Sequence, residues 1–352
     1  MKRILVTGTG GSASTNFIRS LRLAPEKIYM VGVDNNKYYI HLSQADKNYL
    51  VPNYTDPNYI DELNKIIVKE KIEFLHCQPD TELQLLSEHR DDIKCKMFLP
   101  SKKAIRTAFH KLICNKALRE NKVSAPCSFY IDSHKDIESA LNILSIKGHT
   151  KFWVRAIKGA GSRAALPVTT YLQAKSWIDY WHTEKDVKYG QFMISEFLPG
   201  KEYAFQSIWA YDKLITSMTR ERLAYVFGAR MPSGQSSSPT IARTCHSEAV
   251  NRIGTQGIRA IDPVPNGIYC VDLKEDKNGV PCITEINAGR FFTTSIFFST
   301  AGSNMPYYYL LSAYGEDLPK LPQYNALPED LYWIRNIDLG DKLVEGKDIK
   351  IQ

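Results

Sequence analysis

Short apolar runs alternate with amphipathic stretches over the first hundred residues of the chain. The pattern predicts strands at Ile4 to Thr7, Ile28 to Val33 and Phe74 to Cys77, and helices at Ser14 to Leu23, Ile60 to Lys69 and Glu82 to His89. Strands that alternate with helices form a parallel sheet with helices on both faces. The first hundred residues are therefore predicted to form a doubly wound α/β domain.

The pattern changes after this point. Met97 to Leu99 resembles a strand, and a single helix is predicted from Ser101 through Glu120. Strand-like segments then dominate, at Phe152 to Ile157, Gln191 to Phe197, Glu202 to Ala210, Lys213 to Thr219, Gly267 to Leu273 and Val280 to Asn287. The fold class is thus α/β followed by α+β. The residues from Leu321 onward have weak periodicity and are expected to be peripheral.

Composition excludes several classes of protein. The 352 residues carry 45 Lys plus Arg against 38 Asp plus Glu, a net charge of +7, with no run of five basic residues, which argues against nucleic acid as a partner. The seven cysteines are scattered without a CxxC pair, so they are expected to be reduced thiols. No stretch of 18 apolar residues and no signal peptide is found, which favours a soluble, cytoplasmic protein without a membrane partner.

A glycine-rich turn follows the first predicted strand. Gly8 to Ala13 fits the pattern G-x-G-x-x-A, and Asp34 ends the second strand, as in dinucleotide-binding domains. One interpretation is an NAD(P)-dependent oxidoreductase. The other is a tight strand-to-helix turn that binds no nucleotide. No Tyr-x-x-x-Lys pair lies in the structural context expected of a short-chain dehydrogenase.

Two later strands form a predicted hairpin through Asn278-Gly279, a strong turn signal. Period-two geometry places Glu285 and Asn287 on one face, and Asp272 lies on the partner strand. Two carboxylates and an amide oxygen form a site suited to Mg²⁺ shared with substrate phosphates. A solvated sheet edge is the alternative.

Two further segments contain groups suited to a nucleotide. Small residues from Lys158 to Arg163 follow a strand that carries Arg155, so they could form a flap over phosphates, although no Walker A sequence occurs in the chain. Glu196 and Glu202 flank a Pro-Gly break and could accept hydrogen bonds from adenine and ribose. An ordinary hairpin and surface glutamates are the alternatives.

Taken in order, these motifs resemble the ATP-grasp superfamily, and within it one half of the large subunit of carbamoyl-phosphate synthase. The resemblance runs from Met1 to about residue 300 and includes His110-Lys111, where the family commonly has Asp-Lys. It implies a pre-ATP-grasp domain over 1–100, a linking helix and small subdomain with the flap over 101–190, an ATP-grasp C-terminal subdomain over 191–320, and a peripheral segment over 321–352.

The resemblance also implies a role for each matching residue. The expected nucleotide-binding residues are Lys111, Arg155, Gly159, Gly161, Ser162, Arg163, Glu196, Leu198 and Glu202, and the expected metal ligands are Asp272, Glu285 and Asn287. Arg290 is the expected catalytic residue near the phosphoryl acceptor. Arg155 stands where many relatives have lysine, and Asn287 to Arg290 is one residue longer than the family's Asn-Pro-Arg.

The function that the resemblance implies is an ADP-forming ligase with ATP and Mg²⁺, or Mn²⁺ in its place, as cofactors. Such an enzyme activates a small-molecule carboxylate as an acylphosphate and joins it to an amine. Carbamoyl-phosphate synthesis itself is disfavoured, because it needs two such halves. The oxidoreductase remains one alternative, and a non-catalytic nucleotide-binding regulatory protein is the other. Oligomeric state stays open, with a homodimer the commonest symmetric assembly.

Overall fold

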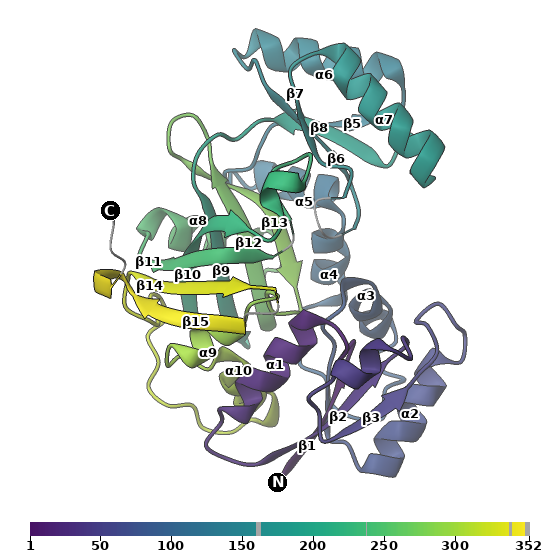
Figure 1. Ribbon diagram of the computed structural model, residues 1–352, viewed down its shortest axis with the longest axis vertical. Helices are drawn as coiled ribbons and strands as arrows, with labels where there is room; N and C mark the ends of the chain where they lie inside the picture. Colours follow the sequence, from purple (N-terminus) through teal and green to yellow (C-terminus); the bar gives the residue numbers. More distant parts are fainter. Residues whose placement is uncertain (160–162, 237, 338–339, 349–352) are drawn as a thin grey trace.

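The computed structural model describes residues 1–159, 163–236, 238–337 and 340–348. These residues form three sheets and the helices that pack against them (Figure 1). Among the described helices, none is long and apolar enough to cross a lipid bilayer.

The N-terminal part of the chain is a parallel sheet in the order β3-β2-β1-β4. Its strands are β1 (Lys2–Thr7), β2 (Ile28–Asp34), β3 (Lys47–Leu50) and β4 (Phe74–His76), and its helices are α1 (Ser12–Arg22), α2 (Tyr59–Glu70) and α3 (Asp80–Glu88). A 3-10 turn, η1 (Tyr39–Leu42), follows β2. Ile4 packs in one core cluster with Phe17 of α1, whereas its neighbour Leu5 packs with Leu63 of α2. Helices therefore cover both faces, and the predicted doubly wound domain is confirmed.

The second sheet is antiparallel, in the order β5-β8-β6-β7. Its strands are β5 (Ser128–Ile131), β6 (Phe152–Ala156), β7 (Leu166–Val168) and β8 (Phe192–Glu196), and its helices are α6 (His134–Ile146) and α7 (Tyr171–Lys185). Both helices lie on the outer side of this small sheet, away from the rest of the molecule (Figure 1). The opposite face is left to border the large sheet.

The third sheet is antiparallel and runs β13-β12-β9-β10-β11-β14-β15. Its strands are β9 (Glu202–Ala210), β10 (Lys213–Tyr225), β11 (Pro239–Cys245), β12 (Gly267–Glu275), β13 (Pro281–Ala288), β14 (Leu331–Asn336) and β15 (Gly340–Glu345). Its helices are α4 (Lys102–Phe109), α5 (Lys111–Glu120), α8 (Glu248–Ile261), α9 (Ile296–Thr300) and α10 (Met305–Tyr314), and two 3-10 turns, η2 (Gly228–Arg230) and η3 (Gly346–Asp348), complete the list.

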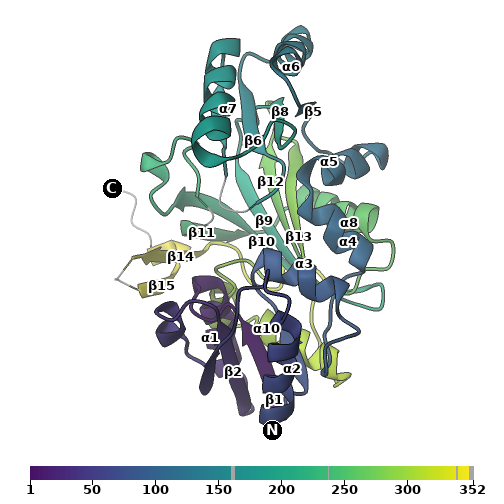
Figure 2. The ribbon, with the colours of Figure 1, turned by 90° about the vertical axis from the view of Figure 1, so that its right-hand side faces the viewer.

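Helices flank this large sheet on both sides (Figure 2). Val271 of β12 packs in the cluster that contains α8, and the adjacent Cys270 packs in the cluster that contains α9 and α10. Alternate residues of each strand thus serve different cores. Asp272 shares the face of Cys270, which places a carboxylate at the end of an apolar stripe.

The prediction of a single helix from Ser101 to Glu120 is wrong, because the chain forms two helices that are separated at His110. His110 leaves the helical region (φ −107°, ψ 94°), and its ring Nδ1 accepts a hydrogen bond from the N–H of Ile113 at 3.3 Å. The imidazole thus caps α5 in the place where the family commonly has aspartate, a usual N-cap residue. Lys111 consequently becomes the first residue of a helix.

Two other expectations need correction. Met97 to Leu99 forms no strand, since only an isolated bridge between Phe74 and Lys96 occurs there. The C-terminal segment, expected to be peripheral, instead adds β14 and β15 to the large sheet. Trp333 of β14 is 1% exposed and stacks on Phe297 of α9, with ring centroids 5.5 Å apart. A single buried ring in a polar stretch produces no periodic pattern, so the sequence does not reveal this strand.

We predict that Trp333→Ala lowers the free energy of unfolding by about 3 to 5 kcal/mol, because it removes a large buried ring and leaves a cavity. Ile337→Ala, at a position 48% exposed just after β14, is the control and should change it by less than about 0.5 kcal/mol. Denaturant unfolding of the two variants checks this. Equally small changes in the free energy of unfolding for both variants would contradict the conclusion that the C-terminal strand is part of the core.

Candidate functional site

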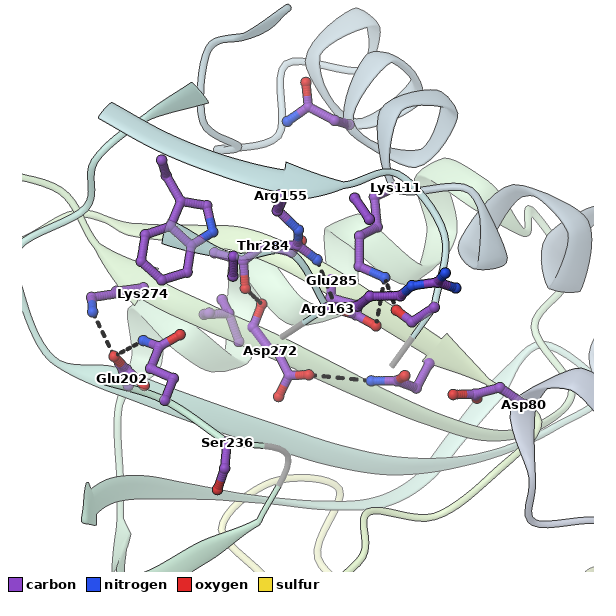
Figure 3. Close-up of a pocket in the computed structure, with 18 of the residues that line it drawn as sticks. Asp80, Lys111, Arg155, Arg163, Glu202, Ser236, Asp272, Lys274, Thr284 and Glu285 are labelled. Atoms are coloured by element: carbon purple, nitrogen blue, oxygen red, sulfur yellow. Dashed lines mark hydrogen bonds and ion pairs between the residues drawn. The ribbon is translucent and has the colours of Figure 1, made fainter. Parts of the chain in front are cut away.

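A cleft of about 510 Å³ lies between the small sheet and the large sheet, and one end reaches the N-terminal domain. In Figure 3, Glu202 and Lys274 lie toward one end and Asp80 toward the other, with Asp272 and Glu285 between them. The cleft is lined by residues of β6 and β8 on one side and of β12 and β13 on the other. Its size and its convergent charged groups are those of a small-molecule site.

The centre of the cleft is an ion cluster around Glu285 of β13. Arg155 of β6 donates to one carboxylate oxygen at 2.9 Å, and Nζ of Lys111, at the start of α5, lies 3.4 Å from the other. Lys111 also donates to the backbone carbonyl of Gly159 at 2.7 Å. The predicted phosphate-binding and metal-binding residues are therefore neighbours, although they come from three separate elements.

Burial and charge act in opposite directions on these groups. Burial alone would raise the pKa of Glu285, but Lys111, Arg155 and Arg290 hold it below its ordinary value. Burial lowers the pKa of Lys111, and the charge of Glu285 opposes that change. The carboxylate is therefore ionised at neutral pH and retains its value as a ligand for a cation.

A second group of charges lies beside the first. Asp272 of β12 accepts from Arg222 of β10 and, at 3.2 Å, from the amide nitrogen of Asn287. Burial raises the pKa of Asp272 while Arg222 opposes the change. Asp272 and Glu285 are paired in register, and the ladder shifts directly after them. The hairpin thus brings all three predicted metal ligands to one face.

Arg290 lies in this cluster despite the longer turn that precedes it. Its guanidinium donates to the oxygen of Asn287 at 2.6 Å and to both oxygens of Asp80 in α3. Gly289, the residue before it, has φ +95°, which glycine adopts without strain. The extra residue is thus absorbed as a left-handed turn that directs Arg290 toward the N-terminal domain.

The segment predicted as a flap connects β6 with β7. Gly159 has φ +102°, and Arg163 lies close to it and lines the cleft. Gly161 and Ser162 lie outside the described residues. The backbone N–H of Ala156 donates to the carbonyl of Arg163 at 3.2 Å, which closes the base of the loop.

The other end of the cleft contains Glu196, Leu198 and Glu202. Both oxygens of Glu196 are bonded, to the N–H of Cys127 at 2.8 Å and to His149 at 3.0 Å. Glu202 accepts from Lys274 at 2.5 Å and also from Tyr225 and Gln235. The buried Leu198 lines the same end. All three lie at the cleft, as the resemblance implies.

The glycine-rich turn of the N-terminal domain is occupied by the chain itself. The Asp34 carboxylate accepts from the N–H groups of Gly10 and Asn36, each at 2.8 Å. A Cβ on Gly10 would lie 2.6 Å from Tyr39, and one on Gly8 would lie 2.4 Å from Pro79. Close backbone packing therefore explains these glycines, and a dinucleotide site finds no support in the turn.

Sequence reasoning missed Asp80 altogether and gave Arg222 no partner. The apolar pattern predicts a helix that starts at Glu82, whereas α3 starts at Asp80. A signal was present, because Gln78-Pro79-Asp80 directly follows a buried parallel strand, and ligands in open α/β sheets bind beyond the carboxyl ends of such strands.

Comparison with known proteins agrees with this geometry. Residues 4–98 match the PylC-like N-terminal domain family, and no curated protein sequence matches the chain. N5-carboxyaminoimidazole synthetase from Staphylococcus aureus with ADP superposes with a TM-score of 0.68 at 14% identity, over 95% of this chain and 81% of that one. The chain has the ATP-grasp fold.

Two other structures support the same assignment of an ATP-grasp fold. L-amino acid ligase from Bacillus licheniformis gives a TM-score of 0.70 at 12% identity, over 95% of this chain and 79% of that one. The biotin carboxylase domain of 2-oxoglutarate carboxylase from Hydrogenobacter thermophilus, in complex with MgADP, ADP and bicarbonate, gives 0.71 at 15% identity, over 94% and 73%. At such low sequence identities, the similarity shows a shared fold and nothing more.

A buried histidine of the N-terminal domain supports the contact between that domain and the segment that follows β13. His76, 1% exposed, stacks on Phe17 and bonds to Gln78 at 2.8 Å, and Gln78 in turn donates to the carbonyl of Phe291 at 2.6 Å. Burial lowers the pKa of His76 to about 4, an effect that the bond to Gln78 only partly offsets. Phe291, the residue directly after Arg290, is thus bonded to Gln78, whose side chain is held by the neutral imidazole of His76.

We predict that this histidine makes the protein less stable in acid. The unfolded chain takes up the proton near pH 6.5 and the folded protein only near pH 4, so the stability is present above pH 6.5 and lost as pH falls toward 4. The loss amounts to about 3 kcal/mol. Denaturant unfolding from pH 7 to 4 should show that His76→Phe removes this part of the pH dependence. Parallel curves for the two proteins would contradict it.

Proposed function

We propose that the chain is an ADP-forming ligase that uses ATP and Mg²⁺ to activate a carboxylate as an acylphosphate, which an amine then attacks. The observation that carries the proposal is the Glu285 carboxylate held between Lys111 and Arg155 on the floor of the cleft. Two cations that converge on one partly buried carboxylate provide charge for phosphates, and that carboxylate provides charge for a metal ion.

The residues present fit a magnesium ion. Asp272, Glu285 and Asn287 offer two carboxylates and an amide oxygen, the hard donors that Mg²⁺ prefers together with substrate phosphates. Among the described residues, no three or more His, Cys, Asp or Glu side chains are grouped so that they could hold a metal ion, and the proposed set contains only two carboxylates, with an amide as its third donor. When bound there, the ion would neutralise charge on the transferring phosphoryl group.

The nucleotide is proposed to lie along the cleft with its base near Glu196 and Leu198. Glu202 would accept from the ribose, and its bonds to Lys274, Tyr225 and Gln235 hold its carboxylate in place for that contact. Lys111 and Arg155 would contact the phosphates, and Gly159 and Arg163, which line the cleft on either side of the predicted flap, would lie beside them. Similar structures have been solved in complex with ADP, ATP and MgADP.

The chemistry then follows from charge and from exclusion of water. The substrate carboxylate attacks the terminal phosphorus of ATP, the bond to the bridging oxygen breaks, and ADP leaves. The amine attacks the acyl carbon, phosphate leaves, and a proton is lost from nitrogen. Lys111, Arg155 and Arg290 stabilise negative charge on the phosphoryl group in transit. A closed flap protects the acylphosphate from hydrolysis.

We predict that Glu285→Gln lowers the rate of phosphate release from ATP by about a hundredfold or more, which corresponds to about 2.7 kcal/mol of transition-state stabilisation. Glu120→Gln, an exposed position on α5 whose carboxylate lies 3.8 Å from Lys116, is the control and should leave the rate unchanged. Activity is measured with a panel of carboxylates and amines. Retention of the full rate by Glu285→Gln with every pair would refute the metal assignment.

The ligand itself separates this function from its alternatives. We predict that ADP with Mg²⁺ raises the melting temperature and that NAD⁺ does not, because the glycine-rich turn is filled by Asp34 and Tyr39. Stabilisation by NAD⁺ alone would indicate an oxidoreductase. Tight ADP binding without turnover across a broad panel would indicate a nucleotide-binding regulatory protein.

A further inference from the structure

The guanidinium of Arg290 donates to the carbonyl of Phe291 at 3.3 Å and has two side-chain anchors of different kinds. One is the carboxylate of Asp80, which takes hydrogen bonds from both Nε and one terminal nitrogen of the guanidinium, so the pair is bidentate. The other is the side-chain oxygen of Asn287, which lies 2.6 Å from the nitrogen that also contacts Asp80. The side chain of Arg290 is 14% exposed, so these contacts are shielded from water.

The second anchor is the oxygen that the proposed function assigns to the metal. A divalent cation on the oxygen of Asn287 and a guanidinium on the same atom repel each other strongly in a site shielded from water. The amide nitrogen of Asn287, for its part, is bonded to Asp272 at 3.2 Å, so the side chain cannot turn freely to offer another atom. Metal binding must therefore release Arg290 from Asn287.

Asp80 is built to retain the guanidinium after that release. It is the first residue of α3, where the helix dipole favours a negative charge. The same helix packs against the turn that carries Arg290, since a Cβ on Gly289 would lie 3.1 Å from Leu83. The helix and the one-residue-longer turn thus hold the two charged groups together independently of Asn287.

We propose that Asp80 is a positioning residue that holds Arg290 at the acceptor end of the cleft while Asn287 is given up to the metal. The inference rests on the proposed function, because it needs the metal at Asn287. Without Asp80, the guanidinium stays on Asn287 and competes with Mg²⁺. The ion pair of Asp80 and Arg290 therefore couples the N-terminal domain to metal binding, which a contact that only holds two domains together would not do.

The test measures the affinity for Mg²⁺ at saturating ADP by calorimetry. Asp80→Asn is expected to weaken Mg²⁺ binding about tenfold, whereas ADP binding in EDTA stays within twofold. Arg290→Met removes the competing cation, so it should not weaken Mg²⁺ binding. The double variant Asp80→Asn/Arg290→Met should bind Mg²⁺ as Arg290→Met does, because Asp80 acts through Arg290.

Turnover gives a second readout. At saturating Mg²⁺, Asp80→Asn should lower kcat for ATP hydrolysis at least tenfold with KM for ATP within twofold, and the double variant should lose no more than Arg290→Met alone. Asp91→Asn, at an exposed acid of the same domain that pairs with Lys102, is the control and should behave as wild type. Asp80→Glu keeps the charge and should retain most of the Mg²⁺ affinity.

Three outcomes would overturn the inference. The first is an unchanged Mg²⁺ affinity in Asp80→Asn, and the second is a loss of Mg²⁺ affinity that persists in the double variant. The third is a double variant whose loss of activity is the product of the two single losses, as expected if Asp80 contacted the amine directly. If Asp80→Asn does not fold, the double variant, which leaves no unpaired charge, and Asp80→Glu still decide between these outcomes. If wild type fails to bind ADP with Mg²⁺, the proposed function fails, which is a different result.

Discussion

The partly buried carboxylate of Glu285 must be balanced by positive charge, and this constraint brings the parts of the cleft together. Its partners are Lys111 at the start of α5 and Arg155 on the small sheet, while Glu285 itself belongs to the large sheet. An unpaired charge in such a place is costly, so the helix break and both sheets are held in the positions that pair it. The break at His110 is part of this requirement, because it places Lys111 at the first turn of α5.

The same pairing explains how the cleft can receive both a nucleotide and a metal. Each cation proposed for phosphates is balanced by a carboxylate proposed for the metal, and Arg222 with Asp272 repeats the arrangement. Phosphates and a metal ion brought in together can replace these internal partners without leaving a charge unbalanced. Arg290 extends the principle to the N-terminal domain, since it contacts Asn287 and Asp80 at once.

Local signals in the sequence were enough to predict the doubly wound domain and the hairpin of β12 and β13. Apolar runs define β1 and β2, and Asn278-Gly279 predicts the turn between β12 and β13, whereas a register shift beside Asp272 aligns that residue with Glu285. Contacts between distant segments could not be predicted in this way. Asp80 meets Arg290 across 210 positions, and Trp333 is buried only because α9 lies beneath it. The break at His110 escaped notice because histidine is an uncommon cap.

Anomalous diffraction from crystals grown with ADP and Mn²⁺ tests the central claim most directly, since it locates the metal without any assumption about the substrates. The account predicts a manganese peak within about 2.0 to 2.4 Å of oxygens of Glu285 and Asn287, with Lys111 and Arg155 turned to the phosphates of ADP. A peak elsewhere, with Glu285 still paired to Lys111 and Arg155 beside bound ADP, would contradict it.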